Sequence, residues 1–132
     1  MPVNTPTRTL GIDYGDARIG LALSYGTLAE PLIVIPNDGS HWDTLQSTIH
    51  EFNVSHLVIG QSEHKMAEKS IAFAQQLSSL VHLPVNMQDE TLSSKEVQTK
   101  LREQRVGKKQ YRGPIDHFAA AIILQRYLDE EA

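Results

Sequence analysis

Residues 9–24 read TLGIDYGDARIGLALS, and the other elements of the chain can be placed around this stretch. Apolar side chains alternate with small or polar ones on both sides of a central turn, which is the period of two pleated strands. Gly15 followed by Asp16 predicts a left-handed turn that folds the second strand straight back on the first. Asp13 then stands at the end of a buried strand, where a carboxylate must be paired, protonated or bound to metal, because an isolated buried charge is too costly.

Two further acids stand where an ordinary surface acid would not be expected. Glu90 ends the apolar run 83–90, which predicts a strand whose tip carries the acid just before the next helix. Asp116 opens the last helix, and its side chain shares a helix face with the apolar residues three, four and seven positions further on. Each acid also has a structural explanation: Asp13 suits a turn, Glu90 suits a helix cap, and an acid in a first helical turn suits the helix dipole.

The chain resembles a known family, the YqgF/RuvX-like proteins, along nearly its whole length. The matching motifs are GIDYG at residues 11–15 with RIG at 18–20, DETLS at 89–93, and IDHFAAAIILQ at 115–125. Members of this family are described as Holliday-junction resolvases or pre-16S ribosomal RNA nucleases with a ribonuclease H-like fold. The resemblance implies that Asp13, Glu90 and Asp116 are the catalytic, metal-binding residues. It also favours maturation of the 5′ end of pre-16S ribosomal RNA over junction resolution.

Length and composition indicate one domain spanning residues 1–132, with residues 1–7 as a loose arm. The chain has 132 residues, of which 40% are hydrophobic, enough for a single core. No window approaches the roughly 20 apolar residues of a membrane-spanning helix, and the first residues lack the apolar core of a secretory signal. We therefore expect a cytoplasmic protein with no membrane partner. Because the chain has no cysteine, oxygen and imidazole ligands are left for a metal, and oxygen ligands suit Mg²⁺ or Mn²⁺.

The periodicity predicts an α/β fold, and the resemblance makes it a ribonuclease H-like domain. The expected elements are two strands within residues 9–24, a strand at 29–35, a helix at 41–52, a strand at 56–60, a helix at 63–81, a strand at 83–90, and helices at 93–105 and 113–128. This order predicts a five-stranded mixed sheet, a three-strand antiparallel meander plus two parallel strands, flanked by about four helices. Ser40 and Asp43 predict a capping box for the first helix. The second helix is expected to bury Ala67, Ile71, Ala74, Leu77, Leu80 and Val81.

The predicted sheet brings the three acids together. Ligands of open sheets bind beyond the carboxyl ends of parallel strands, where Asp13 and Glu90 should emerge, and the last helix would carry in Asp116. Three ionised carboxylates repel one another, so the cluster requires protons or cations, and a divalent metal is the natural solution. Bound Mg²⁺ or Mn²⁺ could activate water and stabilise a leaving oxygen across a phosphodiester bond. We therefore predict a nuclease that hydrolyses phosphodiester bonds with the help of metal.

Basic residues concentrate in one segment, although the formal net charge is -4. Seven of the twelve Lys and Arg residues lie between positions 95 and 112, so this segment is locally cationic. Contacts with nucleic-acid phosphates are predicted for Arg18, Lys100, Arg105, Lys108, Lys109 and Arg112. A solvated helix face and loop explains the same segment equally well, and Arg18 has the alternative of pairing with Asp16. The six histidines show no metal-ligand spacing and are interpreted as surface or incidental polar residues.

Three alternatives to RNA maturation stay open at the level of the sequence. Holliday-junction resolution would need a symmetric dimer, whereas RNA trimming would not, and no exposed apolar stripe decides between a monomer and a homodimer. A catalytically silent RNA- or protein-binding module is the second alternative. The third is a nucleotide-phosphate-binding protein, because Asp13, Gly15 and Gly20 also resemble the phosphate loop of the actin and sugar-kinase superfamily.

One loop departs from the pattern of the family. Family members usually have a Gly-Leu-Pro run and an Asp-Gly turn after the fourth strand, whereas residues 59–65 read IGQSEHK in this chain. This loop borders the predicted cleft, so it is the place where substrate choice, or even activity, would differ from the family norm.

Overall fold

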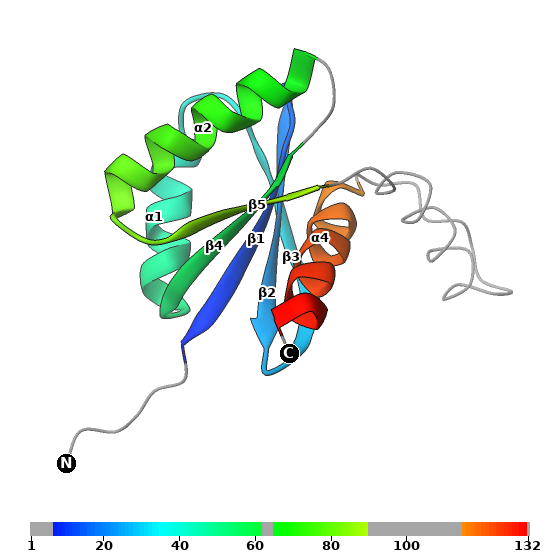
Figure 1. The fold of residues 1–132 in the computed structure, drawn as a ribbon. Helices are drawn as coiled ribbons and strands as arrows, with labels where there is room; N and C mark the ends of the chain where they lie inside the picture. The colour runs from blue at the N-terminus through cyan, green and yellow to red at the C-terminus, as the bar shows by residue number, and fades with distance from the viewer. Residues whose placement is uncertain (1–6, 62–64, 90–114, 132) are drawn as a thin grey trace, which may run out of the picture.

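The computed structural model describes residues 7–61, 65–89 and 115–131 of the 132-residue chain (Figure 1). The elements are β1 (Arg8–Tyr14), β2 (Arg18–Tyr25), β3 (Leu28–Pro36), α1 (His41–Glu51), β4 (Val54–Gln61), α2 (Lys65–Val81), β5 (Val85–Asp89) and α4 (Asp116–Glu131). The helix expected at 93–105 lies outside the described residues. Among the helices that are described, none has the length and apolar character needed to cross a membrane.

The strands form one sheet in the order β3-β2-β1-β4-β5. β1 pairs antiparallel with β2, and β2 pairs antiparallel with β3, which is the predicted meander. β1 also pairs in parallel with β4, and β4 pairs in parallel with β5. α1 and α2 lie on one side of the sheet and α4 lies on the other (Figure 1). The predicted mixed sheet is therefore confirmed, and the ends of β1 and β4 are neighbours.

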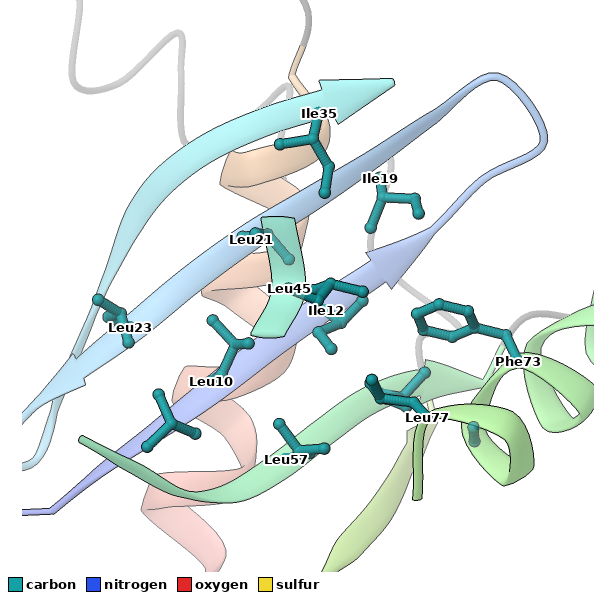
Figure 2. Close-up of a cluster of buried hydrophobic side chains, with 13 residues drawn as sticks. Leu10, Ile12, Ile19, Leu21, Leu23, Ile35, Leu45, Leu57, Phe73 and Leu77 are labelled. Carbon is teal, nitrogen blue, oxygen red and sulfur yellow. The ribbon is translucent and has the colours of Figure 1, made fainter. Parts of the chain in front are cut away.

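The larger hydrophobic core lies between the sheet and the helices α1 and α2 (Figure 2). Alternate residues of β1 and β2, such as Leu10, Ile12 and Leu21, are fully buried there, as the period of two predicts. Leu45 of α1 and Leu77 of α2 belong to the same cluster. Full burial of one such side chain stabilises the fold by about 1.5–3 kcal/mol relative to exposure. This core holds the sheet rigidly and so fixes the residues at the strand ends.

The buried face of α2 differs from the predicted one. The expected burial of Ile71 and Leu80 is wrong, because 39% and 43% of their surfaces are exposed. The buried row begins at Ser70 and continues with Phe73 and Leu77, at the spacing of one helix face. Because Ser70 is polar, a search for apolar residues at helical spacing does not detect this row.

The loop between β1 and β2 is held by hydrogen bonds and not by a left-handed glycine. The prediction of a left-handed Gly15 is wrong, and Gly26 in the two-residue turn between β2 and β3 has the positive φ of 64° instead. Gly15 is needed for close packing, since a Cβ there would lie 2.7 Å from the carbonyl oxygen of Arg18. Asn37 fixes the loop: its side chain donates to the Gly15 carbonyl at 2.8 Å, and its N–H donates to the Ala17 carbonyl at 3.0 Å.

The start of α1 also differs from the prediction. Ser40 precedes the helix with helical φ and ψ and makes no side-chain cap bond, so the expected capping box with Asp43 is wrong. A capping oxygen needs non-helical backbone angles at this position. The Ser40 hydroxyl and N–H both donate to one oxygen of Asp38, at 2.5 and 3.0 Å, and these bonds lower the pKa of Asp38 below its ordinary value.

α4 covers the other face of the sheet and also protects one edge of it. β3 is an edge strand, so its outer N–H and C=O groups have no neighbouring strand. Gln125 of α4 bonds to one of these groups and to the turn before the strand. Its side-chain oxygen accepts from the Ala29 N–H at 2.8 Å, and its amide donates to the Thr27 carbonyl at 2.9 Å. The contact closes part of an edge that would otherwise be available to another chain.

One histidine is a core residue. His41 is 5% exposed, and its ring lies 4.6 Å from that of Trp42 and 6.3 Å from that of Phe73, centroid to centroid. Its Nδ1 accepts a hydrogen bond from the Gly39 N–H at 3.2 Å. Burial lowers the pKa of His41, and the charge of Asp38 opposes this shift only in part. The interpretation of the histidines as surface or incidental residues is therefore wrong for His41.

We expect acid to destabilise the protein through His41. Its folded-state pKa lies below the 6.5 of an exposed histidine, so the unfolded chain takes up the proton first as the pH falls. The free energy of unfolding should therefore fall as the pH is lowered through 6.5, by at most about 1.4 kcal/mol per pH unit from this residue. Urea denaturation at several pH values between about 5.5 and 7.5 measures the slope.

The variant His41→Gln isolates this contribution. Glutamine does not titrate, and its oxygen can still accept from the Gly39 N–H. The variant should lose less stability than the parent between neutral and acid pH, although His117, whose pKa is also lowered by burial, will leave some slope in both proteins. Equal slopes in the two proteins would assign the acid sensitivity to other groups.

Candidate active site

Asp13 lies at the end of β1 on the side of the sheet that α4 covers. Its neighbour Ile12 is fully buried in the core on the opposite side, and side chains alternate along a strand. Asp13 pairs directly with Gly20 of β2, so these two residues face the same side. Asp13 is half-buried. The end of the central strand therefore presents a carboxylate on the face where α4 begins.

Gly20 brings the start of α4 onto this pair of strands. A Cβ at Gly20 would overlap the carbonyl group of Asp116 and would lie 2.6 Å from the backbone nitrogen of His117. Only glycine leaves room for the helix backbone at this position. Because Gly20 is also the cross-strand partner of Asp13, the backbones that carry Asp13 and Asp116 meet at one end of the sheet. The structure thus brings together two of the three predicted acids.

A second glycine allows the same close packing further along α4. A Cβ at Gly11 would lie 2.7 Å from the Cβ of Leu124 and 3.0 Å from the carbonyl oxygen of Ala120. Ala22, the cross-strand partner of Gly11, is fully buried in the smaller hydrophobic cluster with these α4 residues. Small residues of β1 and β2 therefore form the surface on which α4 rests, and they fix the helix relative to Asp13.

Arg18 makes an ion pair with Asp116. The Arg18 Nε donates to Asp116 Oδ2 at 2.9 Å, and the side chains are 54% and 21% exposed. The hydrogen bond and the negative charge of Asp116 raise the pKa of Arg18 above its ordinary value. The alternative pairing of Arg18 with Asp16 is wrong, because Asp16 bonds to Lys69 of α2 at 2.8 Å. Arg18 therefore lies at the candidate site.

His117 is a neighbour of Asp116 that the sequence pattern does not single out. Its ring packs against Phe118, with the ring centroids 4.4 Å apart. Burial lowers the pKa of His117, and the charge of Asp116 opposes the shift only in part. Burial therefore favours the neutral form of the imidazole beside Asp116. Its position next to the acid in the IDHFAA motif is the one signal that could have drawn attention to it.

The remaining predicted site residues lie outside the part of the chain that the structure describes. They are Glu90, Lys100, Arg105, Lys108, Lys109 and Arg112. β5 ends at Asp89, and β4 pairs in parallel with both β5 and β1, so the described end of β5 points to the same edge as Asp13. Within the described ranges, no three Asp, Glu or His side chains are grouped so that they could hold a metal ion.

Comparison with known proteins identifies the family. A family model described as "RuvX: Holliday junction resolvase" matches residues 7–130, nearly the full length of the chain. The chain belongs to the RuvX family. A relative from Anaeromyxobacter sp. is 39% identical in an alignment 132 residues long, which covers 92% of this chain and 96% of that protein. One from Syntrophus aciditrophicus is 36% identical, covering 92% and 88%.

Both relatives bear the description "Putative pre-16S rRNA nuclease". Membership of the RuvX family confirms the resemblance seen in the three motifs. It also confirms the predicted enzyme class, a hydrolase that acts on phosphodiester bonds.

Solved structures share the fold of this RuvX chain. Thermus thermophilus RuvC in complex with a Holliday junction substrate matches with a TM-score of 0.63, 15% identity and 96% coverage of each chain. The fowlpox virus resolvase in complex with Holliday junction DNA matches with a TM-score of 0.62 and 10% identity, covering 95% of this chain and 99% of that one. At such identities the likeness concerns the fold alone. It confirms the predicted ribonuclease H-like architecture.

Proposed function

We propose that this RuvX-family protein is a metal-dependent nuclease that trims structured RNA in the maturation of the 5′ end of pre-16S ribosomal RNA. The observation that carries the proposal is the contact of Gly20 with the Asp116 backbone, because Gly20 is also the partner of Asp13. Two acids from distant segments at one strand end are what a metal-assisted phosphodiesterase needs. The descriptions of the two relatives support RNA as the substrate.

The described acids fit a divalent metal such as Mg²⁺ or Mn²⁺. Asp13 is half-buried and the Asp116 side chain is 21% exposed, so both carboxylates are partly withdrawn from water but reachable. Carboxylate oxygens are the ligands that these ions prefer. The hydrogen bond of Arg18 goes to Oδ2 of Asp116 and not to Oδ1. In the proposed site, Asp13, Glu90 and Asp116 hold the metal.

The residues of the chain have distinct parts in the proposed reaction. A bound divalent metal supplies Lewis acidity and neutralises the charge that develops at the scissile phosphate. Asp13 on β1 and Asp116 on α4 keep their oxygens in fixed positions, so little reorganisation is needed during the reaction. The basic residues predicted between positions 100 and 112 contact phosphates beside the cleaved bond. Positioning and electrostatics therefore account for the rate, with no covalent intermediate.

Holliday-junction resolution is the second candidate, because the matching family model carries that description. The chemistry at the acids would be the same for both substrates. A junction must be cut on two strands in a symmetric way, which requires two sites related by a two-fold axis. Trimming of RNA requires one site, so the two candidates differ in the assembly and the substrate and not in the reaction.

Cleavage of both substrates in parallel tests the proposal. The parent protein is incubated with RNA that carries the 5′ precursor extension and with a four-way DNA junction, each in Mg²⁺, Mn²⁺ and EDTA. We expect cleavage of the RNA in either metal, none in EDTA, and cleavage by Asp13→Asn that is slower by at least about 100-fold. Faster cutting of the junction would favour the second candidate. Cleavage that persists in EDTA would contradict the metal dependence, and metal binding without cleavage of either substrate would indicate a silent binding module.

A further inference from the structure

Arg18 is placed where it can control the carboxylate of Asp116. We propose that Arg18 is a positioning residue: its hydrogen bond holds one oxygen of Asp116 so that the other oxygen is presented to the metal. Its positive charge weakens metal binding, and its geometry raises the cleavage rate. This inference rests on the metal-dependent cleavage proposed above, and it assigns Arg18 a role through Asp116 in place of a contact with the substrate.

The geometry of β2 gives Asp116 two points of contact on one strand. Arg18 and Gly20 are two residues apart on β2, so both face α4. Gly20 meets the main chain of Asp116, and Arg18, closer to the β1–β2 loop, reaches its side chain with Nε 2.9 Å from Oδ2. One contact sets the position of the residue and the other sets the rotation of its carboxylate. The loop before Arg18 is itself fixed by the hydrogen bonds of Asn37.

Stability does not explain the ion pair. The Arg18 side chain is 54% exposed, and exposed pairs contribute little to the free energy of unfolding. The N-terminus of a helix carries a partial positive charge, so a guanidinium beside the first turn of α4 is unfavourable for the helix. Asp116 alone already suits that helix end. The gain from Arg18 is therefore the orientation of the carboxylate.

The pair predicts an effect on metal affinity that runs opposite to its effect on rate. A divalent cation at Oδ1 of Asp116 is repelled by the guanidinium charge, so Arg18 lowers the affinity. The hydrogen bond at Oδ2 also prevents the carboxylate from binding the ion through both oxygens. Loss of Arg18 should therefore tighten metal binding and slow cleavage together. A residue with a merely structural role would not separate the two in this way.

The test measures Mn²⁺ binding by electron paramagnetic resonance without substrate, and RNA cleavage at saturating Mn²⁺, on the full chain. For Arg18→Gln we expect a Kd for Mn²⁺ lower by about threefold or more. Its kcat should fall by about 10- to 100-fold, as is typical when a group that orients a metal ligand is lost, with KM for RNA within about threefold. Arg18→Lys keeps the charge but not the planar donor, so its Mn²⁺ affinity should stay within about twofold of the parent while kcat falls.

Lys69→Gln is the matched control. Lys69 pairs with Asp16 at 2.8 Å, and its side chain is 54% exposed, as that of Arg18 is. The substitution removes an ion pair of similar length and exposure that does not touch Asp116. We expect parental Mn²⁺ affinity and parental cleavage, and circular dichroism of both Gln variants checks that each is folded.

Several outcomes would overturn the inference. Unchanged Mn²⁺ affinity and kcat in Arg18→Gln would do so, and so would weaker Mn²⁺ binding. A rise in KM alone would mean that Arg18 binds substrate phosphates directly. A parent protein that binds no Mn²⁺ and cleaves neither substrate overturns the proposed function itself, whereas an active parent with an Arg18→Gln variant that behaves like Lys69→Gln overturns the role of Arg18 alone.

Discussion

Replacement of Asp13 by Asn should slow phosphodiester cleavage by at least about 100-fold. Asparagine keeps the size of the side chain but removes the negative charge that holds the metal in the proposed site. A loss of several kcal/mol of transition-state stabilisation corresponds to two or more factors of ten in rate. Asp13 faces the start of α4 from the end of β1, next to its cross-strand partner Gly20. Initial rates at saturating Mg²⁺ measure the effect.

Asp16→Asn is the control for this substitution. It removes the same chemical group three residues away, where the side chain is 65% exposed and pairs with Lys69. We expect it to cleave at the parental rate. Asp116→Asn should match Asp13→Asn, and the double variant should be little slower than either, because groups that act as a unit are not additive. An Asp13→Asn protein as active as Asp16→Asn would rule out the proposed site.

Gly20→Ala should disturb both the fold and the activity. The added methyl group would overlap the Asp116 carbonyl, which is backbone and cannot rotate away, so the start of α4 must move off the sheet. Overpacking of this kind costs about 1–3 kcal/mol of the free energy of unfolding. The same movement displaces the Asp116 carboxylate relative to Asp13, and a misplacement of about 1 Å can reduce the rate by about 100-fold. Urea denaturation and cleavage rates measure the two effects.

Leu77→Ala separates loss of stability from loss of alignment. Leu77 is fully buried between α2 and the sheet, on the face opposite to α4. Its truncation should cost about 2–5 kcal/mol, at least as much as Gly20→Ala. At a temperature where both variants are folded by circular dichroism, Leu77→Ala should keep most of the parental activity. Equal activity of the two variants would show that the position of α4 does not matter for cleavage.

The sheet could be predicted because its determinants are local. Burial of one face imposes a period of two on a strand, and the alternation in residues 9–24 shows which side chains of β1 and β2 enter the core. The strand-helix-strand order predicts a parallel crossover, and β4 lies in parallel beside β1 as expected. The approach of Asp116 to Asp13 follows from the same topology. The place of Asp13 at the end of β1 is likewise a property of the fold class.

Contacts across the chain could not be predicted in the same way. Gly20 and Arg18 both stand in a recognised motif, but their contacts with Asp116 depend on the angle at which α4 crosses the sheet. No periodicity within β2 encodes that angle. The exposed Asp16 was the nearer candidate for Arg18 along the sequence, and Lys69 from α2 takes it instead. Proximity in sequence is a weak guide when distant helices supply competing partners.

The wrong predictions for α2 and for the loops have a further cause. The 17-residue helix α2 has more than one apolar row, and a polar Ser70 in the buried row made the exposed row with Ile71 look stronger. A buried histidine such as His41 is equally hidden, because its side chain is classed as polar until its neighbours are known. Glycine in a turn likewise has two uses, and Gly15 serves close approach and not a positive φ. Composition alone does not separate these cases.

The bonds from Gln125 connect the β2–β3 turn and the start of β3 to the helix that carries Asp116. Gln125 follows Asp116 by nine positions on the same helix, about 14 Å along its axis. α4 is held at two points, by its contact with Gly20 near its start and by the bonds of Gln125 to Thr27 in the β2–β3 turn and to Ala29 in β3. A change in the position of either contact would change the tilt of the whole helix. The β2–β3 turn therefore helps to set the angle of α4 and with it the position of Asp116.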